Sequence, residues 1–264
     1  MQIKIAQWNI GGGLVRRDDS DPLSSSSYTE DGLEHIIEFL REENPDVVTL
    51  QETQERGDYC QAKMIADSIG LPYWVNHSTD QSFFDTEKLI GQAILSRYPI
   101  IESRFSPFSN PGFTKRSDEG AIIRSKNGGL TSCVVQTPNG SPIAIKSFHM
   151  VPFHFFNIGL QCHAALSVIR EIGTSVGSGG FATILAADFN LDAPSLRTNM
   201  PELLENGFCE IPQIQPTTPK GKRLDHVLFS GLHAVESRVL DAAKTDHFPV
   251  ISILSETEEP DENR

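Results

Sequence analysis

The sequence of 264 residues is poor in cysteine, in basic side chains and in long apolar runs, and each shortage excludes a class of protein. Its four cysteines lie far apart and form no Cys-x-x-Cys pair, which excludes the common zinc and dithiol redox motifs. No apolar run approaches the roughly 20 residues that a membrane-spanning helix needs. The sequence has 22 Lys and Arg residues and 35 Asp and Glu residues, which gives a net charge of −13. We therefore expect no tight, non-specific binding of duplex DNA, which requires a broad basic face.

The remaining composition is typical of a soluble globular protein, with 38% hydrophobic and 22% charged residues. Residues 1–10 predict a β-strand and lack a cationic segment and a cleavage site, so we expect no secretory signal and a cytoplasmic protein. The mostly apolar flanks of the cysteines fit buried free thiols in a reducing compartment. We expect one domain over residues 1–255, with a monomer favoured, and an acidic, flexible tail over residues 256–264.

Strand-like runs recur at short intervals, and helical stretches separate only some of them. The runs cover residues 2–7, 46–51, 91–96, 121–124, 130–137, 142–148, 181–186, 223–229 and 247–254. Apolar residues at helical spacing predict helices over residues 33–40, 62–69 and 158–172, and a weaker one over 196–205. We expect a capping box at residues 27–30 and irregular loops over residues 18–27, 103–120 and 173–180. Asn-Gly turns at 127–128 and 139–140 indicate hairpins, so packed mixed sheets with helices outside are favoured over a doubly wound sheet.

Polar side chains stand where many of the predicted strands begin or end, a position where sheets commonly hold catalytic groups. These residues are Asn9, Glu52, His149, Asp188, Asn190, Asp246 and His247, with Asp225 inside the last strand but one. Carboxylate and amide oxygens are the ligands that Mg²⁺ or Mn²⁺ prefers, and a histidine beside an acid acts as a general base or as an electrostatic clamp. The set fits metal-assisted hydrolysis of a phosphate ester, whereas the sequence has no P-loop. Taken alone, Asn9 fits a turn residue as well as a metal ligand, and Glu52 fits a helix cap as well as a metal ligand.

A series of short segments identifies a family resemblance. The segments QWNI (7–10), LQE (50–52), GQAILSRYPI (91–100), SFHMVP (147–152), DFN (188–190), RLDHV (223–227) and TDHFPV (245–250) occur in this order. In this they resemble the endonuclease/exonuclease/phosphatase superfamily, and the resemblance extends from Trp8 to Val250. It implies a mixed α/β fold, a four-layered sandwich in which two mixed β-sheets pack face to face with helices on both outer faces.

The resemblance also implies a metal site. By position, Asn9 and Glu52 resemble the ligands of the catalytic Mg²⁺ or Mn²⁺, and Asp246 resembles a ligand or a residue directly behind the ligands. In the exonuclease III-like and tyrosyl-DNA phosphodiesterase 2 branches an aspartate stands two residues after the asparagine, whereas this chain has Gly11. The AP-endonuclease branch carries a tyrosine where this chain has His149, so an AP endonuclease is disfavoured.

The same resemblance implies roles for the catalytic side chains. Asp188 resembles the residue that orients or deprotonates the attacking water, and Asn190 the residue that holds the water or the phosphate. His149 resembles the histidine that contacts the scissile phosphate. His247 resembles a second catalytic histidine, with Asp225 as its hydrogen-bonded partner.

We therefore expect a divalent-metal-dependent phosphodiesterase that hydrolyses a nucleic-acid or nucleotide-like ester by in-line attack of water. A short, single-stranded or damaged nucleic acid agrees with the net charge of −13. One alternative is an inositol-phosphate or phospholipid hydrolase on the same scaffold, although no membrane anchor is evident. The other is a binding module that kept the fold and lost catalysis.

Three other polar features have both a structural and a functional interpretation. His226 fits a structural role better than a catalytic one, because its neighbours alternate between apolar and polar residues. His154 stands among phenylalanines and suits either stacking on a substrate or packing under a loop. The basic residues Lys220, Lys222 and Arg223 fit a solvated loop and a local phosphate-binding patch equally well.

Overall fold

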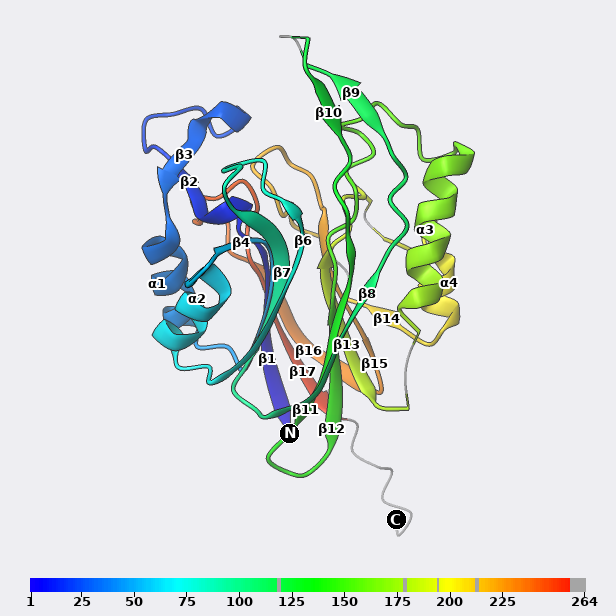
Figure 1. Ribbon diagram of the computed structural model, residues 1–264. Coiled ribbons are helices and arrows are strands. Elements are labelled where there is room, and N and C mark those ends of the chain that lie inside the picture. The colour runs from blue at the N-terminus through cyan, green and yellow to red at the C-terminus, as the bar shows by residue number, and fades with distance from the viewer. Residues whose placement is uncertain (118–119, 178–179, 194, 212–213, 257–264) are drawn as a thin grey trace.

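The computed structural model describes residues 1–117, 120–177, 180–193, 195–211 and 214–256, and two large β-sheets face each other in it (Figure 1). The first sheet contains, in order, β16 (Leu232–Val239), β17 (Val250–Glu256), β1 (Gln2–Asn9), β4 (Val47–Arg56), β7 (Leu89–Ser96) and β6 (Tyr73–Gln81), and the short β5 (Tyr59–Cys60) pairs with β4. The second contains, in order, β14 (Cys209–Glu210), β15 (Asp225–Ser230), β13 (Ala182–Asp188), β12 (Pro142–Ser147), β11 (Gly129–Gln136) and β8 (Ile100–Pro107).

Both sheets are mixed. The β1–β4 pair of the first sheet and the β12–β13 pair of the second are parallel, while pairs such as β1–β17 and β13–β15 are antiparallel. Two ribbons extend from the sheets, β2 (Leu14–Arg16) with β3 (Tyr28–Asp31), and β9 (Thr114–Arg116) with β10 (Ile122–Arg124). The described helices are α1 (Leu33–Glu43), α2 (Gln61–Ile69), α3 (His163–Ser175) and α4 (Pro201–Glu205), with 3₁₀ turns at Gly11–Gly13 and Ser25–Ser27.

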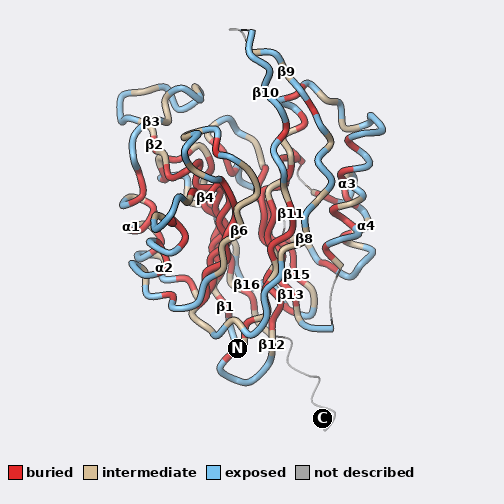
Figure 2. Tube along the Cα trace, viewed as in Figure 1, coloured by how far each residue is buried: buried red, intermediate tan, exposed pale blue. Residues whose placement is uncertain are grey.

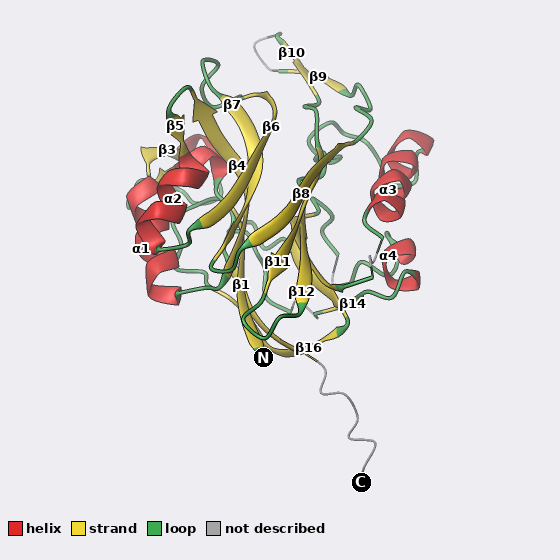
Figure 3. Ribbon diagram, turned by 60° about the horizontal axis from the view of Figure 1, so that its bottom comes forward, coloured by secondary structure: helices red, strands yellow, loops and turns green. Residues whose placement is uncertain are grey.

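Apolar side chains fill the space between the sheets and the space under the helices. Ile5 and Val47 of the first sheet meet Ile145 and Ile184 of the second in one buried cluster. The apolar faces of α1 and α2 close a second cluster on the first sheet, and those of α3 and α4 close a third on the other sheet. Figure 2 shows the buried residues gathered along the facing strands, and Figure 3 shows the helices on the outer sides of the sheets. The expected mixed α/β fold with two main mixed sheets is confirmed.

The expected capping box at residues 27–30 is wrong, because Tyr28–Asp31 forms strand β3. Helix α1 begins after Gly32, and the Asp31 carboxylate accepts a hydrogen bond of 3.1 Å from the Leu33 N–H. The helix ends as expected before Pro45, with Asn44 in the left-handed conformation at a φ of 46°.

Three loop and helix boundaries also differ from expectation. Helix α3 starts at His163 instead of residue 158 and runs to Ser175, into the loop expected over residues 173–180, of which 178–179 lie outside the described residues. The loop expected over 103–120 contains the end of β8 and all of β9, and residues 118–119 lie outside the described residues. The Asn-Gly turn at 139–140 joins β11 to β12 as expected, whereas β10 pairs with β9 and not with β11.

The C-terminal strand and the cysteines add two corrections. Glu256 is the last residue of β17, so it does not belong to the expected tail, whose residues 257–264 lie outside the described residues. Cys60 and Cys133 are buried free thiols as expected, but Cys162 and Cys209 are exposed free thiols. In the described part of the chain no helix is long and apolar enough to cross a membrane.

Gly91 is a buried glycine in β7 whose replacement tests the packing of the sheet. A Cβ at this position would lie 2.3 Å from the backbone oxygen of His77 in the neighbouring β6. Gly91→Ala is therefore expected to destabilise the protein by about 2–3 kcal/mol, since backbone atoms of a paired strand cannot move aside cheaply. Urea unfolding measures the change in the free energy of unfolding. Gly159→Ala is the control, because a Cβ there meets nothing within 4 Å, and equal stability of the two variants would contradict the packing.

Candidate active site

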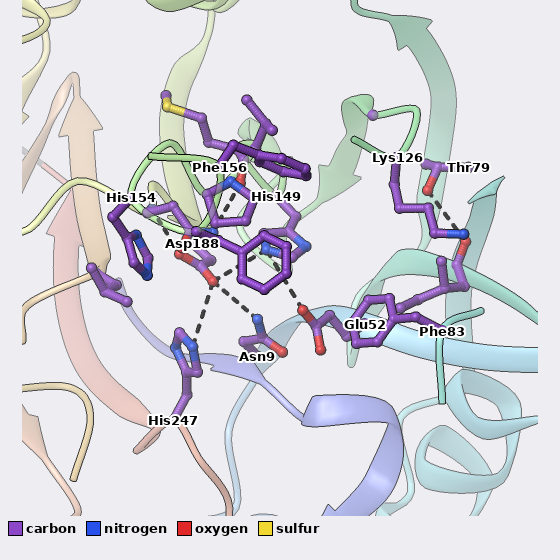
Figure 4. A pocket seen from close by; sticks show the side chains of 18 of the residues that line it. Asn9, Glu52, Thr79, Phe83, Lys126, His149, His154, Phe156, Asp188 and His247 are labelled. Carbon is purple, nitrogen blue, oxygen red and sulfur yellow. Dashed lines mark hydrogen bonds and ion pairs between the residues drawn. The ribbon is translucent and has the colours of Figure 1, made fainter. Parts of the chain in front are cut away.

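The strands that carry the predicted site residues end around a cavity of about 650 Å³ (Figure 4). Asn9 is the last residue of β1 in the first sheet, and Asp188 is the last residue of β13 in the second. The Asn9 Nδ2 donates a hydrogen bond of 2.9 Å to Asp188 Oδ2. Both side chains are buried. This bond therefore ties the two sheets together in the wall of the cavity.

Glu52 reaches the cavity from a bulge in β4. The register between β4 and β7 shifts at this position, and Glu52 has a φ of 57°, in the left-handed region that non-glycine residues rarely adopt. Burial raises the pKa of Glu52 to about 7, and the nearby carboxylates of Asp246 and Asp188 add to the rise although His149 opposes it. A positive charge beside this carboxyl would favour its ionised form.

Asp246 completes the acidic side of the cavity. Its Oδ1 is buried and has no hydrogen-bond partner among the described residues. A Cβ added to Gly11 would lie 2.7 Å from this oxygen, so any larger residue at position 11 would displace Asp246. The Gly11 N–H meanwhile donates to Asn9 Oδ1 at 3.0 Å. The glycine that departs from the pattern of related branches thus makes room for an aspartate from another part of the chain.

The side-chain oxygen atoms of Asn9, Glu52 and Asp246 are suitable ligands for a hard divalent cation. An unpartnered buried carboxylate oxygen and a second buried carboxyl with a raised pKa are costly without a compensating positive charge. Carboxylate and amide oxygens are also the ligands that Mg²⁺ and Mn²⁺ prefer.

His149 and Asn190 lie on either side of Asp188. His149 Nε2 is 3.5 Å from Asp188 Oδ2 and 3.7 Å from Glu52 Oε1. The Asn190 N–H donates to Asp188 Oδ1 at 2.8 Å, and its Nδ2 donates to the Met150 carbonyl oxygen at 2.8 Å. Asn190 has a φ of 48°, which turns the chain sharply after the strand. Both oxygens of the Asp188 carboxylate are therefore held in fixed directions.

His247 is buried between two acids. Its Nδ1 is 2.8 Å from Asp225 Oδ2, and its Nε2 is 3.8 Å from Asp188 Oδ2. Burial of His247 opposes its protonation, but the carboxylates of Asp225 and Asp188 outweigh that effect and raise its pKa well above the ordinary value of 6.5. Burial also raises the pKa of Asp188. The Trp8 Nε1 donates to the His247 carbonyl oxygen at 3.0 Å, so a core side chain anchors the segment.

A buried network of amides and hydroxyls supports the site from behind. The Gln7 Nε2 donates to Asp225 Oδ1 at 2.9 Å and to Gln51 Oε1 at 2.7 Å. The Gln51 Nε2 donates to the Ser147 hydroxyl of the opposite sheet at 2.8 Å. This network was not predicted, because its only signal in the sequence is a glutamine near the end of each of two apolar strands.

Asp188, Asp225 and His247 form a second group whose ligand atoms all lie within 4.8 Å of one another. Both oxygens of Asp225 already contact protein groups, since Gln7 donates to Oδ1 and His247 Nδ1 lies beside Oδ2. These contacts fit a hydrogen-bonded pair better than a metal site.

All of the predicted site residues come together in the structure. Asp225 lies behind His247, and the others line the cavity: Asn9, Glu52, His149, Asp188, Asn190, Asp246 and His247. His226 lies outside it, with Nε2 3.2 Å from the Arg223 carbonyl oxygen and Nδ1 3.4 Å from Glu210 Oε1, which confirms its structural interpretation.

Comparisons with known proteins agree with this architecture. The chain matches the model of the Endonuclease/Exonuclease/phosphatase family over residues 6–247. An endonuclease/exonuclease/phosphatase from Beutenbergia cavernae DSM 12333 has a TM-score of 0.73 and 17% identity, over 96% of this chain and 71% of that one. The human Nocturnin catalytic domain with a bound sulfate anion has a TM-score of 0.65 and 16% identity, over 97% and 94% of the two chains.

A third solved structure is the mannosyl-6-phosphatase Bt3783 of Bacteroides thetaiotaomicron VPI-5482, with a TM-score of 0.59 and 16% identity over 96% of this chain and 99% of that one. A search of curated protein sequences found no match. Identities this low show a shared fold and leave the substrate open.

Proposed function

Because the chain belongs to the endonuclease/exonuclease/phosphatase family, we propose that it is a phosphodiesterase that depends on Mg²⁺ or Mn²⁺ and hydrolyses a nucleic-acid or nucleotide-like ester. The observation that carries the proposal is the connected series of Asn9, Asp188, His247 and Asp225, which spans both sheets at the cavity. A phosphoryl group placed there would meet an acid, a cation site and two histidines at once.

Glu52, Asn9 and Asp246 would hold the divalent cation. When bound, the cation supplies positive charge that polarises the phosphorus–oxygen bonds and stabilises the leaving group. The two acids approach the site from different strands and loops, so their positions are set by the fold and not by local sequence.

Asp188 would orient the attacking water and accept its proton. Burial raises the pKa of this carboxyl, which makes it a better base near neutral pH than an exposed aspartate. Asn9 and the Asn190 N–H fix the two carboxylate oxygens, so the water would be held in one direction for in-line attack.

His149 and His247 would stabilise the phosphoryl oxygens as negative charge develops on them. His247 keeps its proton because two carboxylates raise its pKa, and a protonated imidazole is a strong donor to an anionic oxygen. Asp225 would act through His247, holding its ring in one orientation.

The cavity wall favours a substrate with a flat or apolar group beside the phosphate. Phe83, Phe108, Phe155 and Phe156 line the cavity together with the polar site. Aromatic rings stack on nucleic-acid bases without reading their sequence, which agrees with a short, single-stranded or damaged strand. We place the enzyme in a reducing compartment such as the cytoplasm, because its four cysteines are free.

Hydrolysis of bis-p-nitrophenyl phosphate and of p-nitrophenyl phosphate tests the proposal. With Mg²⁺ or Mn²⁺ the diester should be cleaved faster than the monoester, and EDTA should abolish cleavage, since the buried acids need the cation. Thermal unfolding in the same buffers should show stabilisation by Mn²⁺ that EDTA removes. Faster cleavage of the monoester would favour a phosphatase instead, and activity in EDTA would contradict the metal.

A further inference from the structure

Three lysines from two separate segments gather around His154 at the wall of the cavity. They are Lys115 on β9, and Lys220 and Lys222 in the loop before β15. Lys220, Lys222 and His154 line the cavity, and the Lys115 Nζ lies 4.5 Å from the centroid of the neighbouring Phe155 ring. Burial lowers the pKa of His154, and the positive charges of the three lysines lower it further, against one opposing aspartate.

None of these three lysines forms an ion pair with a described residue, although the chain has 35 acidic residues against 22 basic ones. Like charges held close together repel, so such a group destabilises the free protein unless an anion joins it. An unneutralised cluster on an acidic protein therefore points to a negatively charged ligand.

Hydrogen bonds hold the backbone of the loop that carries Lys220 and Lys222. The Thr217 N–H donates to the Lys222 carbonyl oxygen at 2.8 Å, and the Gly221 N–H donates to the Thr218 carbonyl oxygen at 3.0 Å. The Lys222 N–H in turn donates to the Thr218 hydroxyl at 3.1 Å. These bonds close a tight turn, so the backbone at the two lysines is ordered before any ligand arrives.

Strand β9, which carries Lys115, and the segment that carries His154 pack on a shared cluster of aromatic rings. The Phe113 ring, two residues before Lys115, lies 6.0 Å from the Phe153 ring and 6.1 Å from the Phe156 ring. Phe153 and Phe156 are buried on either side of His154. Lys115 and His154 are consequently fixed relative to each other by one packed cluster.

Acidic and basic side chains occupy different parts of the cavity wall. Its acidic residues are Glu52, Asp188 and Asp246, all in the candidate reaction centre, and the other charged residues among the described lining are cationic: Arg124, Lys126, Lys220 and Lys222. Figure 4 shows His154 and Lys126 on opposite sides of the cavity, with Glu52 and Asp188 between them. Lys126 lies 3.8 Å from Asp80, so a single phosphate at the centre would leave Lys220 and Lys222 as the lysines of the described lining without an acidic partner.

We propose that Lys115, His154, Lys220 and Lys222 form a subsite for a second phosphate of the substrate, beside the phosphate that is hydrolysed. This inference rests on the proposed phosphodiesterase function and narrows its substrates. The enzyme then selects esters that carry a neighbouring phosphate, such as a short nucleic-acid strand, over isolated diesters. The aromatic wall and the second phosphate together favour a nucleotide unit over a simple alkyl phosphate.

The test compares dithymidine monophosphate, TpT, with its 5′-phosphorylated form, pTpT, which has the same scissile bond and one additional phosphate. The ratio of kcat/KM for pTpT over TpT should be about tenfold or more in the wild type, because hydrogen bonds to charged groups are strong. Lys220→Ser together with Lys222→Ser should bring the ratio close to one. Lys63→Ser together with Arg170→Ser removes the same charge elsewhere and should keep the wild-type ratio.

Two further measurements make the outcomes distinct. Calorimetric binding of pTpT and TpT tests the subsite without turnover: absence of hydrolysis with lysine-dependent preference for pTpT contradicts the proposed activity and keeps the subsite. Equal binding and equal turnover of the two compounds in the wild type overturns the subsite. Co-sedimentation with phosphatidylglycerol vesicles tests binding of a lipid phosphate instead. Lysine-dependent vesicle binding together with a pTpT/TpT ratio near one overturns the nucleotide subsite as well.

The Lys220→Ser, Lys222→Ser variant should be no less stable to urea than the wild type, since the repulsion between the two lysines is removed.

Discussion

Glu52→Gln is expected to lower kcat/KM for a phosphodiester by about a thousandfold, since a bound metal supplies several kcal/mol of charge stabilisation and each ~1.4 kcal/mol is tenfold. Glutamine keeps the shape of the side chain and one oxygen but removes its negative charge. The bulge in β4 holds Glu52 in the left-handed region at the cavity, whereas Glu55, the other acid of the strand, does not line it. Calorimetric titration with Mn²⁺ should show affinity weaker by about tenfold or more, because a carboxylate ligand has been lost.

The same variant has a separate signature in the metal-free protein. The pKa of Glu52 is raised from 4.5 to about 7 in the folded state, so the folded protein holds this proton more tightly than the unfolded chain. Stability contributed by Glu52 is therefore lost as the pH rises from about 4.5 to about 7, the window in which the unfolded chain has already released the proton. In EDTA, urea unfolding of the wild type should show this loss, and Glu52→Gln should show less of it.

Glu55→Gln is the matched control, because Glu55 lies on the same strand, accepts hydrogen bonds from Asn76 and Ser78, and does not line the cavity. It should leave kcat/KM within about threefold, as is usual for substitutions outside the site. Wild-type kcat/KM and Mn²⁺ affinity in folded Glu52→Gln would refute the metal site.

The buried strands of the two main sheets could be predicted from the sequence, whereas the edge strands β6 and β16 of the first sheet could not. β1, β4 and β13 are covered on both faces, so their apolar runs are long and plain. β6 and β16 lie at the ends of the first sheet, and apolar and polar residues alternate little in them because few of their residues are buried. Their sequences, such as the polar stretch at residues 76–81, give no strand signal without the neighbouring strand.

The site residues could be predicted because each follows or precedes a strong strand, as Asn9 and Asp188 do. The contacts that join these residues could not be predicted. The contact of Gln7 with Asp225 crosses between the sheets, and neither sequence segment indicates the other. Lys115 reaches the Phe155 ring, next to His154, because the packing of Phe113 on Phe153 places β9 there. Periodicity gives the elements, and long-range packing gives their partners.

His247→Ala is expected to lower kcat for a phosphodiester by about a thousandfold while the fold survives, because a protonated donor to the phosphoryl oxygens is removed. The side chain is 11% exposed and lines the cavity, so its loss opens space to water and leaves the core intact. Asp225 would then lose its partner at Oδ2, but Gln7 still donates to Oδ1. Urea unfolding verifies that the variant is folded, and His233→Ala on the exposed face of β16 is the control for histidine removal.

Asp225→Asn separates the role of the acid from that of the ring. The carboxylates beside His247 raise its pKa, so activity that needs the protonated ring is lost as the pH rises through that raised value. Asparagine removes one of the two charges, the pKa of His247 falls, and the alkaline limb of the kcat profile should move to lower pH, with kcat reduced by about a hundredfold at its maximum. A merely structural aspartate would lower stability without moving the limb. A limb that stays in place in the folded Asp225→Asn protein, or near-normal turnover in folded His247→Ala, would show that this pair does not hold the proton used in the reaction.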